Sequence, residues 1–163
     1  MWNQAVAQFA YGLGRMAFGN PTRSRSGNEL SDVLEMMAQI PALALQRRKE
    51  NGAMFYLHVG GASYGVLVLG AKGIIEISVV SKLCFPLGRV PPEIRLVGHL
   101  AAGDESSMKV SVLDMDDISA MQAVATGPAS ELSVQACVEI LGNLAAAVEQ
   151  CDRFAVERGF ARR

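Results

Sequence analysis

Three short segments in the middle of the chain follow a strand-like pattern of apolar and polar positions. Residues 55–59 and 74–81 alternate with a period of two, and residues 64–69 form a short apolar run between glycine-rich segments. The pattern predicts three consecutive antiparallel strands joined by tight turns. Within 74–81, the side chains expected to face the helices are Ile75, Ile77 and Val79, whereas Glu76 and Ser78 should face solvent or a partner.

A proline-started segment and a second pair of strand-like segments follow. Pro91 and Pro92 open a predicted helix that extends to residue 102, where Gly103 is a stop signal. Residues 108–115 and 118–125 then predict a hairpin that turns at Asp116-Asp117. The predicted inner face of the short helix consists of Ile94, Val97, Leu100 and Ala101.

Two longer helices are predicted on either side of these segments. Residues 28–50 carry acidic side chains near their start and the cations of 47–49 near their end, which suits the helix dipole. Pro41 removes a backbone donor, so a kink or break is expected near 39–41. Residues 130–159 carry one broad apolar stripe with helical period and predict the last and longest helix.

A separate apolar seam lies in residues 1–18. Its large side chains recur every four or three residues, which places them on one side of a helix. Gly12 and Gly14 each weaken such a helix by about 1 kcal/mol relative to alanine, so it needs a surface to fold against. We expect this seam to contact a second subunit or a client protein; it consists of Trp2, Val6, Phe9, Leu13 and Met16.

The order of these segments predicts an α+β fold. We expect an antiparallel sheet of about five strands with helices on one face, in the order α-βββ-α-ββ-α, preceded by the N-terminal amphipathic helix. Residues 19–27 are rich in Gly, Pro and Ser and read as a linker. The chain is therefore expected to divide into an N-terminal segment and linker, 1–27, and a single α+β domain, 28–163.

Over about residues 28–158, this order of elements resembles that of the small dimeric chaperones of bacterial type III secretion. The resemblance rests on the order alone and is accompanied by no short diagnostic motif. It implies a protein-binding module, often a dimer, that holds partly unfolded segments of a client. Two features depart from that family: its members tend to be strongly acidic, whereas this chain has a net charge of −1, and residues 1–27 are extra.

The composition of the chain limits the kinds of binding partner and the cellular compartment that we expect. A sequence pI near 6.1 gives no basic field that would attract nucleic acid, and the apolar stretches fall short of the roughly 20 residues that span a bilayer. Cys137 and Cys151 lie 14 residues apart, about 21 Å along one predicted helix, and cannot bridge each other there. With Cys84 they are expected to be buried, reduced thiols, which favours a cytoplasmic protein.

The sequence shows no complete catalytic or metal-binding motif. His58 and His99 have no neighbouring ligands at metal spacing, and the acidic run 114–117 lacks the central glycine of a calcium loop. The glycine-rich segment 60–65 precedes a strand and not a phosphate-binding helix, and Cys84 has no nearby base. We therefore expect no catalytic residue, no metal site and no cofactor.

Two classes of function remain open at this point. The first is a non-enzymatic, chaperone-like protein-interaction module, a homodimer with a protein client, in which Phe85 and Leu87 of the irregular apolar segment 83–92 add to the contact surface. The second is a small-molecule-binding or enzymatic α+β domain with its pocket between the sheet and helix 91–102. Buried titratable groups that converge on a pocket would favour the second class of function. An apolar interface without such groups would favour the first class.

Overall fold

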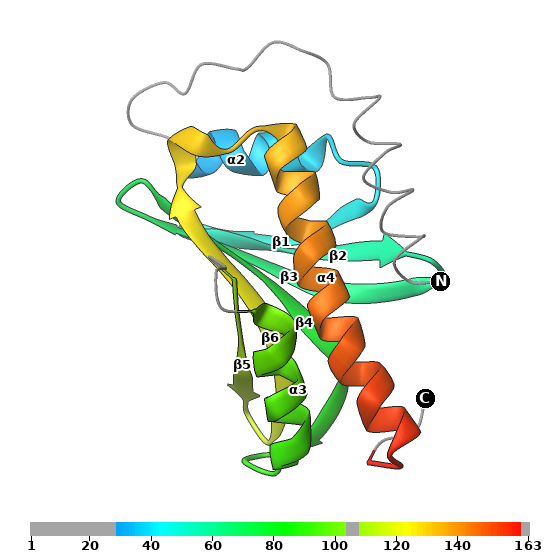
Figure 1. Ribbon diagram of the computed structural model, residues 1–163. Helices are drawn as coiled ribbons and strands as arrows, with labels where there is room; N and C mark the ends of the chain where they lie inside the picture. Colours follow the sequence, from blue (N-terminus) through cyan, green and yellow to red (C-terminus); the bar gives the residue numbers. More distant parts are fainter. Residues whose placement is uncertain (1–28, 104–107, 161–163) are drawn as a thin grey trace.

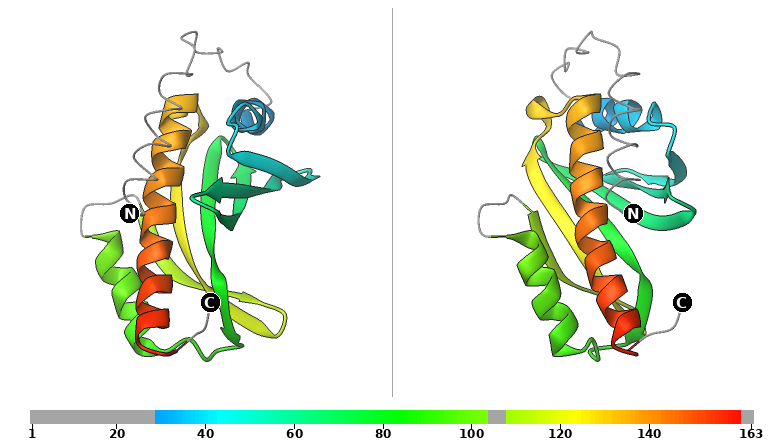
Figure 2. Two further views of the ribbon diagram at one scale, coloured as in Figure 1. Left: turned by 90° about the vertical axis from the view of Figure 1, so that its right-hand side faces the viewer. Right: turned by 45° about the vertical axis from the view of Figure 1, so that its right-hand side comes forward.

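A curved six-stranded antiparallel sheet carries the helices α3 and α4 side by side on one face (Figures 1 and 2). The structure, a computed structural model, describes residues 29–103 and 108–160. The strand order in the sheet is β1-β2-β3-β4-β6-β5. In chain order the elements are α2 (Glu29–Ala38), β1 (Leu43–Lys49), β2 (Gly52–Val59), β3 (Ala62–Ala71), β4 (Ile74–Pro86), α3 (Pro92–Ala102), β5 (Met108–Met115), β6 (Ile118–Pro128), the 3-10 turn η1 (Ala129–Glu131) and α4 (Val134–Glu157).

The α+β class and the order of elements are confirmed, with one more strand than the five expected. The predicted helix 28–50 is wrong in its second half: α2 ends at Ala38, and β1 occupies Leu43–Lys49. Pro41 separates the two elements, since it cannot donate the hydrogen bond that would continue the helix. The segment beyond it gains its hydrogen bonds by pairing with β2, where Leu43 lies opposite Leu57.

The predicted turns are confirmed and follow from residues that tolerate a positive φ. Gly60 and Gly61 connect β2 to β3 with φ values of 57° and 79°. Lys72 and Gly73 connect β3 to β4 with φ values of 52° and 77°, the left-handed pair of a two-residue hairpin. The third turn is at Asp116-Asp117, as expected, although β6 continues to Pro128, past the predicted end at 125.

Alternation along β4 decides which side chains enter the core. Ile75, Ile77 and Val79 are buried on the side that faces the helices, as predicted. Ser78 departs from the expectation of a solvent-facing residue, because it is only 3% exposed. It lies between Leu67 of β3 and Val124 of β6, whose larger side chains flank a small one on the same face.

Helix α4 is the long amphipathic helix expected from the C-terminal pattern. Ser133 caps it, because its Oγ accepts a hydrogen bond from the backbone N–H of Ala136 at 3.1 Å. The apolar stripe contributes Leu141, Leu144 and Val148 to the main core. The helix crosses β4 and β6 (Figure 1) and so supplies the layer against which the middle of the sheet packs.

The predicted inner face of α3 is right for Ile94, Val97 and Ala101, which pack against the core, and wrong for Leu100. Ile94 and Gly98 are its buried positions, whereas Leu100, assigned to the inner face, is 70% exposed. The close approach at Gly98 explains why Leu100 faces outward: a Cβ atom at Gly98 would lie 2.6 Å from Val110 Cγ1 and 2.9 Å from Met121 Cε, so the side of the helix that carries Gly98 is the one in contact with the sheet. Glycine lets the helix backbone settle onto β5 and β6, and the leucines on the opposite side then point outward.

Replacing Gly98 with valine is therefore expected to destabilise the protein by about 1–3 kcal/mol, the usual cost of overpacking a filled core. Chemical denaturation of the variant measures this free energy. Ala102→Val, at a half-buried position of the same helix, is the control: helix propensity alone predicts a loss for alanine to valine at 102 and none for glycine to valine at 98. Equal losses in the two variants would show that α3 does not depend on the close approach at Gly98.

Candidate protein-binding surfaces

Two leucines give the outer side of α3 an exposed apolar surface. Leu96 is 58% exposed and Leu100 is 70% exposed, and their i, i+4 spacing places them next to each other along the helix. Figure 2 shows α3 at the outside of the helical layer. The two leucines form a small apolar surface on the outer side of the helix.

The face of the sheet that points away from α3 and α4 is a second apolar surface, which we call the outer sheet face. Its central row crosses the strands in the order Met54, Leu67, Ser78 and Val124, since each of these residues lies opposite the next. Beside this row lie three larger apolar side chains, the exposed Tyr56 and Leu69 and the buried Val80.

A cation stands at each end of the central row. Arg47 of β1 lies opposite Met54, and Lys109 of β5 lies opposite Val124. Both side chains are exposed. The neighbouring row holds Glu76, half-buried opposite Leu69 and Thr126. The outer sheet face is thus apolar along its middle and positive at both edges.

The two contact residues predicted in segment 83–92 lie in different environments. Phe85 is buried in a second core cluster with Ile94 and Met121, so its ring packs inside the protein. Leu87, two residues later, is 50% exposed and remains available on the surface. The seam residues Trp2, Val6, Phe9, Leu13 and Met16 lie outside the residues that the structure describes.

Two carboxylates of α4 point into the protein and make buried hydrogen bonds to the sheet. The Tyr64 hydroxyl donates to Glu149 Oε2 at 2.9 Å, and the Ser81 hydroxyl donates to Asp152 Oδ1. The ammonium of Lys82 lies 5.5 Å from the centroid of the Tyr64 ring. These contacts tie α4 to β3 and β4 through buried acidic groups that belong to none of the sequence motifs considered above.

A signal for these carboxylates was present in the sequence. Glu149 lies four residues after Ala145, and Asp152 four residues after Val148, so both occupy the apolar stripe of α4. Acidic residues at stripe positions predict buried polar contacts. The partners, Tyr64 and Ser81, are 85 and 71 residues distant in the chain, and the sequence pattern cannot identify them.

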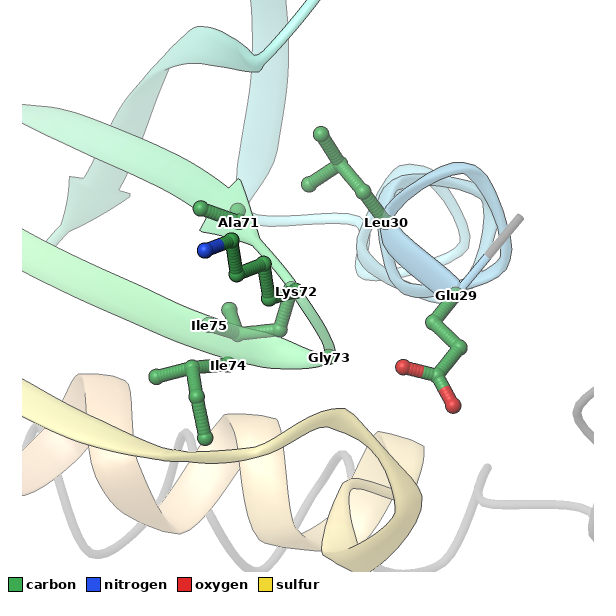
Figure 3. A pocket seen from close by; sticks show the side chains of 8 residues that line it. Glu29, Leu30, Ala71, Lys72, Gly73, Ile74 and Ile75 are labelled. Carbon is green, nitrogen blue, oxygen red and sulfur yellow. The ribbon is translucent and has the colours of Figure 1, made fainter. Parts of the chain in front are cut away.

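The expected pocket between the sheet and α3 is filled by side chains. Gly98 of the helix lies against Val110 of β5 and Met121 of β6 too closely for a ligand to enter. One cavity, of about 290 Å³, lies between the start of α2 and the β3–β4 turn, where Leu30 and Glu29 face the turn residues (Figure 3). Another, of about 310 Å³, is lined mainly by apolar side chains of β4, β6 and the first turns of α4.

Neither cavity gathers catalytic chemistry. Glu149 and Asp152 line neither of them. Within residues 29–103 and 108–160, no group of three His, Cys, Asp or Glu side chains is placed to hold a metal ion. No helix in the same part of the chain is long and apolar enough to cross a membrane.

The cysteines divide into two buried thiols and one exposed thiol, so the expectation that all three are buried is wrong for Cys84. Phe85, the next residue of β4, enters the core, and alternation therefore turns Cys84 to the other face. Burial raises the pKa of Cys137 to about 11 and that of Cys151 to about 12, the latter with a contribution from Asp152.

Labelling of the native protein at pH 8 with a thiol reagent should therefore be fast at Cys84 and slow at Cys137 and Cys151. Denaturant should make all three react quickly. Because folding raises the pKa of the buried thiols, stability should fall as the pH rises from about 9 towards 11 and 12. Mass spectrometry of labelled peptides assigns the sites; rapid native labelling of Cys137 would contradict this placement of α4.

Comparison with known proteins gives a match at the level of the fold. A chain of the HopA1-SchA chaperone–effector complex is similar to this protein with a TM-score of 0.55 and 11% sequence identity. The match covers 80% of this chain and 98% of the other. No protein-family model and no curated protein matches the sequence. The resemblance inferred from the order of elements is thus confirmed as a likeness of fold.

Proposed function

We propose that this protein is a non-enzymatic, chaperone-like module that binds segments of other proteins and acts as a homodimer. The observation that carries the proposal is the exposed pair Leu96 and Leu100 on a fold shared with a chain of a chaperone–effector complex. The outer sheet face adds a second apolar surface, so that one surface can serve self-association while another serves a client.

The alternative, a ligand-binding or enzymatic domain with a pocket beneath helix 91–102, has less support. The space beneath α3 is packed around Gly98. The buried acids Glu149 and Asp152 hold hydroxyls of the sheet and lie away from the two cavities. These acids are accounted for as contacts that fix α4 on β3 and β4.

A cytoplasmic location and the division at residue 27 are further parts of the proposal. The location rests on three free thiols, one of them exposed, which suit a reducing compartment. The division rests on the linker composition of 19–27 and on the separate apolar seam that precedes it.

The seam of residues 1–18 is proposed as an additional contact in self-association. Trp2→Ala, Phe9→Ala and Leu13→Ala together should raise the dissociation constant of the dimer at least tenfold, since each removes a large apolar side chain. Sedimentation across a concentration series measures the change. An unchanged constant would exclude the seam from self-association, leaving Leu96 and Leu100 to account for it.

Binding of an unfolded protein tests the proposed function. Fluorescently labelled, reduced and carboxymethylated α-lactalbumin, which stays unfolded in water, should raise its anisotropy as this protein is added and should saturate. Native α-lactalbumin, labelled in the same way, should not bind, because its apolar side chains are buried. No binding of the unfolded form up to about 100 μM would overturn the proposal.

A further inference from the structure

The outer sheet face has dimensions and charges that suit one kind of partner. Its central row runs over the six strands from Arg47 through Met54, Leu67, Ser78 and Val124 to Lys109. Neighbouring strands lie about 4.8 Å apart, so the row is about 24 Å long along the sheet. The part between the cations, from Met54 to Val124, spans three strand intervals, about 14 Å, and is apolar except for the buried Ser78; one cation lies a strand beyond each of its ends.

The positive charges at both ends of the row argue against two possible occupants of the outer sheet face: the same face of a second copy, and the N-terminal residues of this chain. If a second copy packed its outer sheet face on the first, cations at both ends of each row would meet cations or lie near them in either orientation. The N-terminal residues 1–27 contain no Asp or Glu and carry Arg15, Arg23 and Arg25. The complementary occupant must supply apolar side chains together with carboxylates.

Helical spacing matches the spacing of the strands. Side chains three or four residues apart on a helix are about 5–6 Å apart, close to the interval between strands. A length of 24 Å corresponds to about 16 helical residues. Glu76, on the neighbouring row, would repel acids at the middle of such a helix, so the carboxylates belong at its two ends.

We propose that the outer sheet face binds an amphipathic helix of a partner protein, laid across the strands, with an apolar stripe and acidic residues in its first and last turns. The proposal rests on the proposed protein-binding function and specifies the class of segment that this face takes. Leu67 contacts the middle of the stripe, and Arg47 and Lys109 pair with the carboxylates at its ends.

Two synthetic peptides of 18 residues test the proposal. Both carry one leucine stripe at helical spacing, and they differ only in the first and last turns, which hold two glutamates each in one peptide and two lysines each in the other. Fluorescence anisotropy should show at least tenfold tighter binding of the acidic peptide to the full-length wild-type protein. The double variant Arg47→Glu/Lys109→Glu should reverse this preference, and Leu67→Glu should abolish binding of both peptides.

Controls separate docking from folding and from the broader function. Arg153→Glu changes an exposed cation of α4, on the other face of the sheet, and should leave the preference as it is. Circular dichroism and thermal unfolding check each variant; if Leu67→Glu does not fold, Leu69→Glu, 47% exposed on the same face, replaces it. Equal binding of the two peptides, no binding, or an unchanged preference in the double variant would overturn the proposal. Continued binding of unfolded α-lactalbumin in that case would leave the general protein-binding function intact.

Discussion

Leu96→Glu together with Leu100→Glu is expected to convert the proposed homodimer to a monomer. Each leucine buried between two subunits contributes about 1.5–3 kcal/mol, and a glutamate in its place adds the cost of removing a charge from water. A total loss above about 4 kcal/mol raises the dissociation constant at least a thousandfold. Size-exclusion chromatography with light scattering should give the 17.4 kDa mass of one chain for the variant and twice that mass for the wild type.

A matched variant makes this result specific to α3. Leu45 of the edge strand β1 is 52% exposed, close to the exposure of Leu96, and lies on another element. Leu45→Glu should leave the dimer intact. If the α3 variant kept the wild-type mass while Leu45→Glu became a monomer, self-association would belong to the sheet edge and not to α3.

Ile77→Ala is expected to lower the free energy of unfolding by about 2–5 kcal/mol. Ile77 is 2% exposed and lies in the main core cluster, on the helix-facing side of β4. Truncation removes buried apolar atoms and leaves a cavity that the surrounding side chains fill only in part. Urea denaturation followed by circular dichroism measures the loss.

The neighbouring position provides the control for Ile77. Glu76 is half-buried on the outer sheet face, so Glu76→Ala should change the free energy of unfolding by less than about 0.5 kcal/mol. Similar large losses at both positions would contradict the assignment of the two faces of β4.

Alternation and turn chemistry made much of the sheet predictable from sequence. The period of two in 74–81 identified the core side chains of β4. Glycine-containing turns with positive φ, Gly60-Gly61 and Lys72-Gly73, marked the β2–β3 and β3–β4 hairpins. The burial of Ser78 could not be predicted in this way, because it depends on Leu67 and Val124 of the adjacent strands. Strand partners are set by tertiary pairing, which a single segment does not encode.

The two larger errors have the same kind of cause. The pattern of 28–50 suited a helix throughout, yet β1 forms beyond Pro41 because β2 offers an edge to pair with. Leu100 suited the inner face of 91–102, yet the close approach at Gly98 sets which side of α3 contacts the sheet. In both cases a contact distant in sequence outweighed a local preference.

The candidate surfaces were less predictable than the fold. Leu87 was identified and is exposed, whereas Phe85 proved to be a core residue, because alternation at the end of β4 turns it inward. The row from Arg47 to Lys109 joins residues of all six strands and becomes visible only when the strand order is known.

Light scattering on a chromatographed mixture of this protein with labelled, reduced and carboxymethylated α-lactalbumin tests dimerisation and client binding together. The molar mass of the eluting complex reports both self-association and client binding. We expect a complex of two copies of this chain with one unfolded polypeptide, formed by the wild type and lost in Leu96→Glu/Leu100→Glu. Elution of the wild type as a single 17.4 kDa chain, apart from the unfolded polypeptide at every concentration, would contradict this expectation.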